Sequence, residues 1–232
     1  MKITNILKNA YELFHGAILT HWIGSILMFS VIYFLYIWLM PIIFERPLTE
    51  LFSLLSSPEE LNALLASGSF QIKLMLFVLL IDGIITPFSA GCYQNFDGVT
   101  KDKFPTFVNV LAHYRSSYTA ALLQYVFLMF ALRSLLGGVL GLLGLPTLNV
   151  ALSLFLSVVF SLTIPILIIE HKSLLEAMRN SYERVMHSFF PIFICLLIGG
   201  LITLLGFFVA GLPVMYAIIF SIYVETKKLK TN

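Results

Sequence analysis

The sequence predicts an all-α membrane protein whose chain crosses the bilayer several times. Hydrophobic residues make up 59% of the 232 residues, and only 11% are charged. An ordinary soluble domain carries about a quarter charged residues, and a soluble surface with this much apolar side chain would aggregate. Inside a bilayer every backbone polar group must be satisfied within the protein, which allows only helices or closed barrels. The apolar runs are long and do not alternate with polar residues, and this pattern favours helices.

Six apolar runs approach the length of about twenty residues that a helix needs to cross the hydrocarbon layer. They cover residues 18–43, 70–93, 117–140, 148–169, 189–208 and 210–225. Basic residues indicate the orientation, because cytoplasmic loops carry an excess of Lys and Arg. With the N-terminus in the cytoplasm, only Arg46, Lys73 and Arg133 lie at or toward the outside, and every other Lys and Arg lies inside. We therefore expect a single integral membrane domain over residues 1–232, with six spans and both termini in the cytoplasm.

The first external loop, residues 44–69, is long enough to hold a short helix of its own. Ser57 stands before Pro58, so the serine has the position of a cap and the proline that of the first helical residue. Glu60 is placed to reach back to the cap. Leu61 and Leu64 then begin an apolar stripe, and we expect this amphipathic helix to lie on the outer surface.

A threefold pattern runs along the cytoplasmic side. Residues 3–15, 106–118 and 173–187 each place apolar side chains at helical spacing, and each segment leads into two apolar runs. In the third segment, Ser173 and Glu176 have the spacing of a capping box. Such a helix lies in the headgroup layer with its apolar face buried there. We interpret the pattern as three units, each an interfacial helix followed by two spans. The alternative is chance similarity among helices that all lie beside a membrane.

Two stretches carry a resemblance to a known family. The second apolar run ends in Pro87-Phe-Ser-Ala-Gly91-Cys-Tyr93, and the fourth ends in Ile164-Pro-Ile-Leu-Ile-Ile-Glu170, ahead of Ser173-Leu-Leu-Glu-Ala-Met-Arg-Asn-Ser181. Together they resemble the YciC-type bacterial inner-membrane proteins and, more loosely, the membrane domains attached to some glycerophosphodiester phosphodiesterases. The resemblance implies a six-helix protein of a Gram-negative inner membrane. It implies no activity, because the shared patterns carry no chemistry and this chain shows no soluble phosphodiesterase domain.

Three residues within the predicted spans are candidates for an intramembrane polar site. Asp82 lies near the middle of the second run, where a carboxylate costs several kcal/mol unless it is protonated, paired or hydrated. Counting depth along an antiparallel hairpin places Asp82 within about one helical turn of Gln124, with Arg133 further out on the third run. One interpretation is a protonated Asp82 that bonds to Gln124 and joins two helices; the other is a proton or substrate site. Arg133 fits either snorkelling to the headgroups or an anion site on the outer side.

A second set of candidate residues gathers at the cytoplasmic face: Glu170, His171, Glu183 and His187. Glu183 and His187 are four residues apart and share a helix face, as metal ligands often do. The HExxH pattern is missing, however, so we predict no metal and no cofactor. Contact with water and lipid phosphates explains these residues better, and we expect Glu170 to anchor the following loop or to pair with Lys172 or Arg179.

Two functions remain open from the sequence. No phosphate-binding glycine loop, no GxSxG motif and no nucleophile with a placed base is present, so we predict a protein that is not an enzyme. The first function is a membrane scaffold or accessory subunit in envelope organisation, with lipids and a protein partner around it and no nucleic acid. The alternative is a small transporter or lipid-handling protein that uses Asp82. Substitution of Asp82 by asparagine separates them, because a scaffold tolerates the amide.

Overall fold

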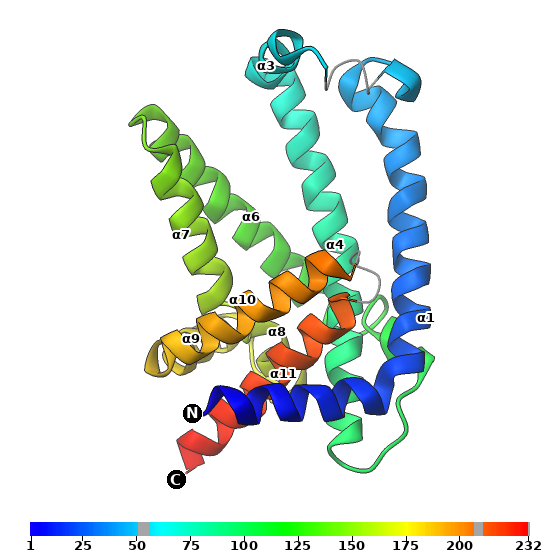
Figure 1. Cartoon of the computed structure of the whole chain (residues 1–232), viewed down its shortest axis with the longest axis vertical. Coiled ribbons are helices and arrows are strands. Elements are labelled where there is room, and N and C mark those ends of the chain that lie inside the picture. Colours follow the sequence, from blue (N-terminus) through cyan, green and yellow to red (C-terminus); the bar gives the residue numbers. More distant parts are fainter. Residues whose placement is uncertain (51–55, 207–210, 232) are drawn as a thin grey trace.

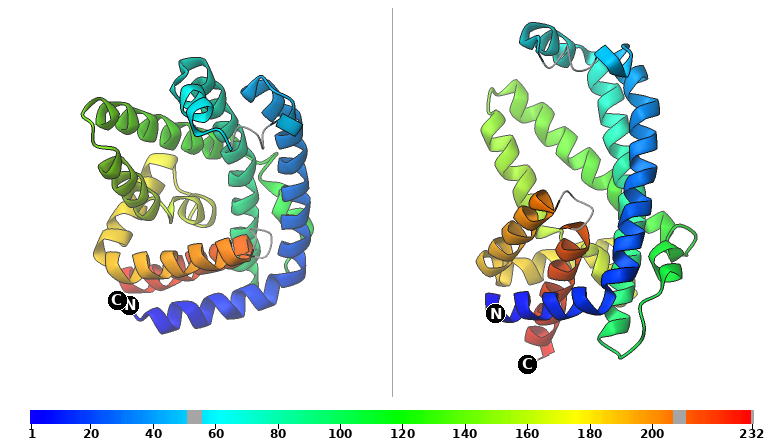
Figure 2. Two further views of the ribbon diagram at one scale, coloured as in Figure 1. Left: turned by 45° about the horizontal axis from the view of Figure 1, so that its top comes forward. Right: turned by 45° about the vertical axis from the view of Figure 1, so that its right-hand side comes forward.

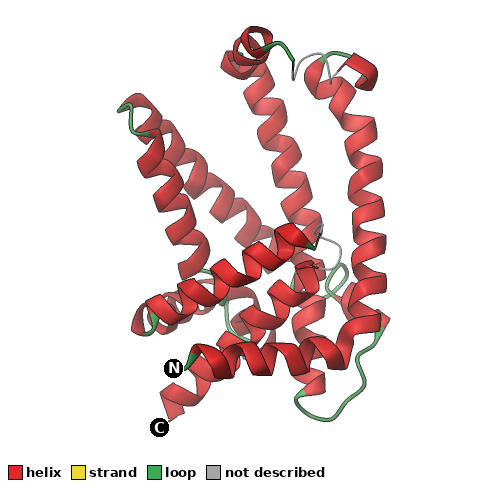
Figure 3. Ribbon diagram, viewed as in Figure 1, coloured by secondary structure: helices red, strands yellow, loops and turns green. Residues whose placement is uncertain are grey.

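The computed structural model describes residues 1–50, 56–206 and 211–231, and within these ranges the chain forms helices and no strand (Figure 3). The elements are α1 (Ile3–Phe44), the short 3-10 helix η1 (Leu48–Glu50), α3 (Pro58–Ala66), α4 (Gly68–Val99), α5 (Phe107–Ala112), α6 (Thr119–Leu142), α7 (Pro146–Val159), α8 (Thr163–Ile169), α9 (Leu174–His187), α10 (Phe189–Leu205) and α11 (Gly211–Thr231). The predicted all-α class is confirmed.

Four segments of the described chain are long and apolar enough to cross a membrane. They are α1, α4, α6 and the pair α7–α8, and they coincide with the first four predicted runs. Helices α9 and α10 form a fifth candidate if they count as one span bent by 102°. Helix α10 alone has 17 residues, and α11 carries Glu225, Lys227 and Lys228 in its last turns. The count is therefore four or five by length and composition, and the six-span topology stays a prediction.

Helix α1 changes direction along its length. Its first turns cross the lower end of the molecule in Figure 1, and the helix then turns upward beside α4. The crossing part packs against α11, where the Ser221 hydroxyl donates to the carbonyl of Ile6 at 2.8 Å and the Asn9 amide donates to Glu225 at 3.3 Å. The two chain ends consequently lie side by side (Figure 2), which places both termini on one side of the protein.

Helix α5 lies against α4 through a glycine contact. A Cβ on Gly91 would lie 2.4 Å from the carbonyl oxygen of Val110, so only glycine permits this approach. Val110 is fully buried there. The predicted helix over 106–118 is too long, because the chain leaves the helix at His113. There the Thr119 hydroxyl donates to the His113 carbonyl at 2.9 Å and holds a turn.

Helix α9 begins with the predicted capping box. The Ser173 hydroxyl accepts from the Glu176 amide at 3.4 Å, and the Glu176 carboxylate accepts from the Ser173 amide at 3.2 Å. One face of α9 covers the break between α7 and α8. The buried Ser181 hydroxyl accepts there from the Leu162 amide at 3.2 Å and donates to the Val159 carbonyl at 2.7 Å. The break is thus hydrogen-bonded by a neighbouring helix.

The external loop contains the predicted helix but not the predicted cap. Helix α3 begins at Pro58, as expected, yet the Ser57 side chain makes no capping hydrogen bond. Glu60 instead forms an ion pair with Arg46 at 3.1 Å, and Glu45 pairs with Lys73. Ion pairs therefore connect the chain after α1 to α3 and to α4, whereas the sequence predicted a local cap at the start of α3.

Most of the apolar core lies at the end of the molecule that carries the termini. Fully buried side chains of α4, α8 and α11 meet the first turns of α1 there. The opposite ends of α1 and α4 share only a small cluster built on Met40, Ile43 and Phe70. Between these ends, helices α6 and α7 splay away from α4 (Figure 1).

Candidate functional site

A cavity of about 600 Å³ lies between α4, α6, α7, α10 and α11. Most of its lining is aliphatic or aromatic, contributed by residues such as Leu154, Phe193, Leu197 and Ile219. Helix α10 forms one wall of the cavity, and this wall has free space at Gly200, because a Cβ added at this glycine would meet no atom within 4 Å. Volumes of about 300–1,000 Å³ with apolar walls and a few polar groups are typical of binding sites for small ligands.

Hydroxyl groups supply the polar part of the lining. The side chains are Thr86, Ser89, Tyr93, Tyr125, Ser157, Ser161 and Tyr216. Ser89 donates to the Thr86 carbonyl at 2.8 Å, and Tyr125 donates to the Phe160 carbonyl at 3.2 Å. The hydroxyl oxygens of Ser161 and Tyr216 are buried and have no hydrogen-bond partner among the described residues. A buried polar group without a partner costs about 1–3 kcal/mol, so these two hydroxyls are suited to bind a ligand.

The structure brings together two of the three predicted intramembrane residues. The guanidinium of Arg133 on α6 interacts electrostatically with the half-buried carboxylate of Asp82 on α4. No hydrogen bond joins Asp82 to Gln124 in the described chain, and Gln124 is exposed. The buried side of α6 carries Leu122 and Val126, each two residues from Gln124 and so about half a turn away. The predicted bond between Asp82 and Gln124 is therefore not formed, because the Gln124 side chain faces away from the buried side of α6.

Arg133 also connects α6 to α7 at the edge of the cavity. One terminal nitrogen donates to the Ser157 hydroxyl at 3.0 Å, and Ser157 donates in turn to the Ser153 carbonyl at 2.7 Å. The Nε of Arg133 is buried without a partner in the described chain. Because Ser157 lines the cavity, Arg133 reaches the edge of the cavity through one hydroxyl, whereas no ion pair of 4 Å or less joins Arg133 to Asp82 in the described chain.

At the predicted cytoplasmic face, Glu170 forms an ion pair with Arg184. Their closest oxygen and nitrogen are 2.8 Å apart, and the side chains are 13% and 8% exposed. The predicted partners Lys172 and Arg179 are wrong, because α9 turns back on the end of α8 and presents its buried face. The guanidinium also lies 5.8 Å from the centre of the Tyr223 ring on α11, so this pair joins three helices.

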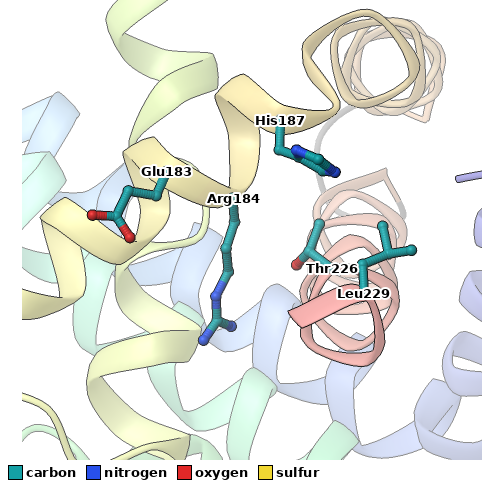
Figure 4. A pocket seen from close by; sticks show the side chains of 5 residues that line it. All are labelled: Glu183, Arg184, His187, Thr226 and Leu229. Carbon is teal, nitrogen blue, oxygen red and sulfur yellow. The ribbon is translucent and has the colours of Figure 1, made fainter. Parts of the chain in front are cut away.

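Of the remaining members of the predicted cytoplasmic set, His171 and Glu183 have side-chain partners, and Glu183 and His187 line one cleft. His171 bonds to the Tyr118 hydroxyl and stacks on its ring, with the centroids 6.0 Å apart. Glu183 accepts from Arg179 at 2.9 Å. His187 is exposed and lines a smaller cleft beside Arg184 (Figure 4). Over the residues that the structure describes, no group of three or more His, Cys, Asp or Glu side chains is placed to hold a metal ion.

Sequence reasoning missed a buried polar network around Asn95. Its amide nitrogen donates to the Thr106 carbonyl at 3.0 Å and lies 3.3 Å from Nε2 of His21. Its amide oxygen accepts from the Thr106 backbone at 3.1 Å and from the Asn109 side chain at 3.0 Å. These bonds fix the loop after α4 against α1, which is a structural role. The available signal was the position of His21 and Asn95 at the cytoplasmic ends of apolar runs.

Comparison with protein-family models, with curated proteins and with solved structures gave no match. The resemblance to the YciC-type proteins therefore stays a prediction from the quoted motifs. Two residues of those motifs have structural partners in the fold: Gly91 contacts Val110, and Ser181 bonds to the α7–α8 break.

Proposed function

We propose that this protein is a non-enzymatic membrane protein that binds a lipid, with an apolar chain in the cavity between α4, α6, α7, α10 and α11. The observation that carries the proposal is the 600 Å³ volume with an apolar lining beside four candidate spans. Acyl chains are abundant around any such helix, and a recess of this chemistry favours their binding over that of a polar solute.

The unpartnered hydroxyls indicate which part of the lipid lies near the helix break. Ser161 and Tyr216 each have a donor to offer, and an ester carbonyl or a hydroxyl of a lipid is a suitable acceptor. Arg133 donates to Ser157 and gives the cavity a charged edge, and the same guanidinium acts electrostatically on Asp82. In this proposal Asp82 contributes to ligand selection, and Asp82→Asn reduces retention while folded protein accumulates normally.

A glycine substitution tests the cavity without disturbing the packing. Gly200→Phe places a ring in the open space of the cavity, whereas Gly138→Phe places the same ring at an exposed glycine of α6 that does not line it. Each protein is extracted from native membranes into lipid discs and then stripped of loosely held lipid. Mass spectrometry of the retained lipids should show a specific species in the wild type and in Gly138→Phe, and its loss in Gly200→Phe. Equal retention in all three would refute the proposal.

A scaffold or accessory-subunit role is the second candidate function. Its support is the exposed aromatic face of α1, where Tyr33, Phe34 and Trp38 are 62%, 70% and 69% exposed. Aromatic side chains of this kind dominate protein interfaces as well as lipid contacts. A stoichiometric protein that co-purifies with the wild type, and that is lost in Trp38→Ala but kept in Gly200→Phe, would favour this role.

We also propose the bacterial inner membrane as the location, with both termini in the cytoplasm. The bias of Lys and Arg and the resemblance to the YciC-type proteins support this placement, and the adjacent termini agree with it. A reporter fused to the C-terminus should give a cytoplasmic signal. A periplasmic signal would overturn the orientation.

A further inference from the structure

We propose that the cleft between α9 and α11, at the end of the molecule that carries the termini, binds one phosphate-type oxyanion through Arg184 and His187. The cleft has a volume of about 260 Å³ and is lined by Glu183, Arg184, His187, Thr226 and Leu229. It is separate from the lipid cavity, and none of its lining residues is shared with that cavity. The inference therefore does not depend on the proposed function.

Arg184 supplies the hydrogen-bond donors of this site. Its side chain is only 8% exposed, and one terminal nitrogen donates to Oε2 of Glu170 at 2.9 Å and lies 2.8 Å from Oε1. The other two guanidinium nitrogens, Nε and Nη1, are buried and have no hydrogen-bond partner among the described residues. Tyr223 offers its ring face 5.8 Å from the guanidinium carbon, which stabilises the charge but accepts no conventional hydrogen bond. Buried charged donors are rarely left open, so an acceptor is expected at this site.

The position of the neighbouring groups favours an anionic acceptor. In Figure 4, Arg184 extends from α9 into the space beside α11, with His187 above it, Thr226 and Leu229 on one side and Glu183 on the other. The Glu183 carboxylate is bonded to Arg179, so its charge is already countered. The other ion pairs of α9 and α11 are closed, because Arg184 pairs with Glu170 and Lys228 pairs with Glu225. The Nε and Nη1 donors of Arg184 are left open, and an anion suits the charge of this group.

Phosphate suits this set of donors better than a carboxylate does. Guanidinium groups bind phosphate oxygens with charge-assisted bonds, and an imidazole adds a donor at a second angle. Phosphate-type oxyanions come from two sources at this end of the protein, a phospholipid headgroup and free phosphate. Both present the same acceptor oxygens to Arg184.

The test measures retention of phosphatidylglycerol against that of diacylglycerol, which lacks the phosphate. Purified full-length protein is titrated with each lipid in detergent and read by native mass spectrometry. Arg184→Lys keeps the positive charge but removes the Nε and Nη1 donors, and Leu229→Trp fills the cleft from α11 without touching the ion pair. Arg115→Lys, at an exposed arginine on the same side, is the matched control.

We expect phosphatidylglycerol retention to fall at least about tenfold in Arg184→Lys and in Leu229→Trp, since a hydrogen bond to a charged group is worth more than the 1.4 kcal/mol that makes a tenfold change. Arg115→Lys should leave this retention unchanged. Displacement of the lipid by millimolar inorganic phosphate would identify free phosphate as a ligand, and resistance would identify the headgroup.

Two results would overturn the inference. One is equal retention of phosphatidylglycerol and diacylglycerol by the wild type. The other is equal phosphatidylglycerol retention by the wild type and the folded Leu229→Trp protein. Leu229→Trp decides the matter alone if Arg184→Lys fails to fold, because Leu229 is 45% exposed and outside the buried ion pair.

Discussion

Replacing Ser181 by alanine removes two hydrogen bonds at once, and both hold the break between α7 and α8. The Ser181 hydroxyl accepts from the Leu162 amide at 3.2 Å and donates to the Val159 carbonyl at 2.7 Å. The serine and Leu162 are both fully buried, so water cannot replace the lost partner without a local opening. We therefore expect the alanine variant to keep the fold, while the Leu162 amide and the Val159 carbonyl lose their hydrogen-bond partner between the helices.

The magnitude follows from these two bonds. A buried amide left without a partner costs about 1–3 kcal/mol, and a typical hydrogen bond contributes about 1 kcal/mol net. We expect Ser181→Ala to lower the free energy of unfolding by about 2–3 kcal/mol. A loss of this size is a large fraction of the stability of an ordinary domain, which is about 5–15 kcal/mol.

The assay is unfolding in mixed detergent micelles, followed by far-ultraviolet circular dichroism during titration with dodecyl sulfate. Ser30→Ala is the control, because the Ser30 hydroxyl is exposed and donates at 2.9 Å to the Ile26 carbonyl within the same helix. That variant should stay within about 0.5 kcal/mol of the wild type, as surface substitutions usually do. If Ser181→Ala proves equally stable, α9 does not hold the break and the reasoning is wrong.

Three further substitutions test other contacts. Gly91→Ala brings a methyl group to 2.4 Å from the Val110 carbonyl and should destabilise the protein by at least about 2 kcal/mol in the same titration, whereas Gly138→Ala should not. Glu170→Gln leaves Arg184 buried without its counter-charge and should cost about 3–5 kcal/mol; a smaller cost for the double variant with Arg184→Met would confirm that the charge is responsible. Burial lowers the pKa of His113 below 6.5. As the pH drops below 6.5, the unfolded chain binds a proton at this ring before the folded protein does. The free energy of unfolding therefore falls in this pH range. His113→Gln should show a shallower fall between pH 7 and 5 than the wild type, and identical slopes would contradict the assignment.

The sequence was informative where a feature depends on a few neighbouring residues. Helix composition, the proline that begins α3 and the capping box of Ser173 and Glu176 are local, and the structure confirms each. The direction of Gln124 was predicted wrongly because depth along a helix says nothing of rotation about its axis.

Features that depend on distant segments could not be predicted. Glu170 has basic neighbours in sequence, yet it pairs with Arg184 because α9 folds back over α8. The cavity of about 600 Å³ could likewise not be predicted from the sequence, since its walls come from helices between residues 85 and 219 that look like ordinary apolar runs. Its two unpartnered hydroxyls stand out only when the surrounding side chains are in place.

The contact between the first turns of α1 and α11 has a consequence for biosynthesis. Ile6 and Asn9 find their partners in Ser221 and Glu225, which leave the ribosome more than two hundred residues later. Contacts of such long sequence separation form late in folding. The chain loses the entropy of closing a long loop before the contact contributes any stabilisation. Residues 3–15 consequently lack these two partners during most of translation. A chain stalled before α11 would present this segment, with Ile6, Ala10 and Leu13 uncovered, to chaperones and proteases.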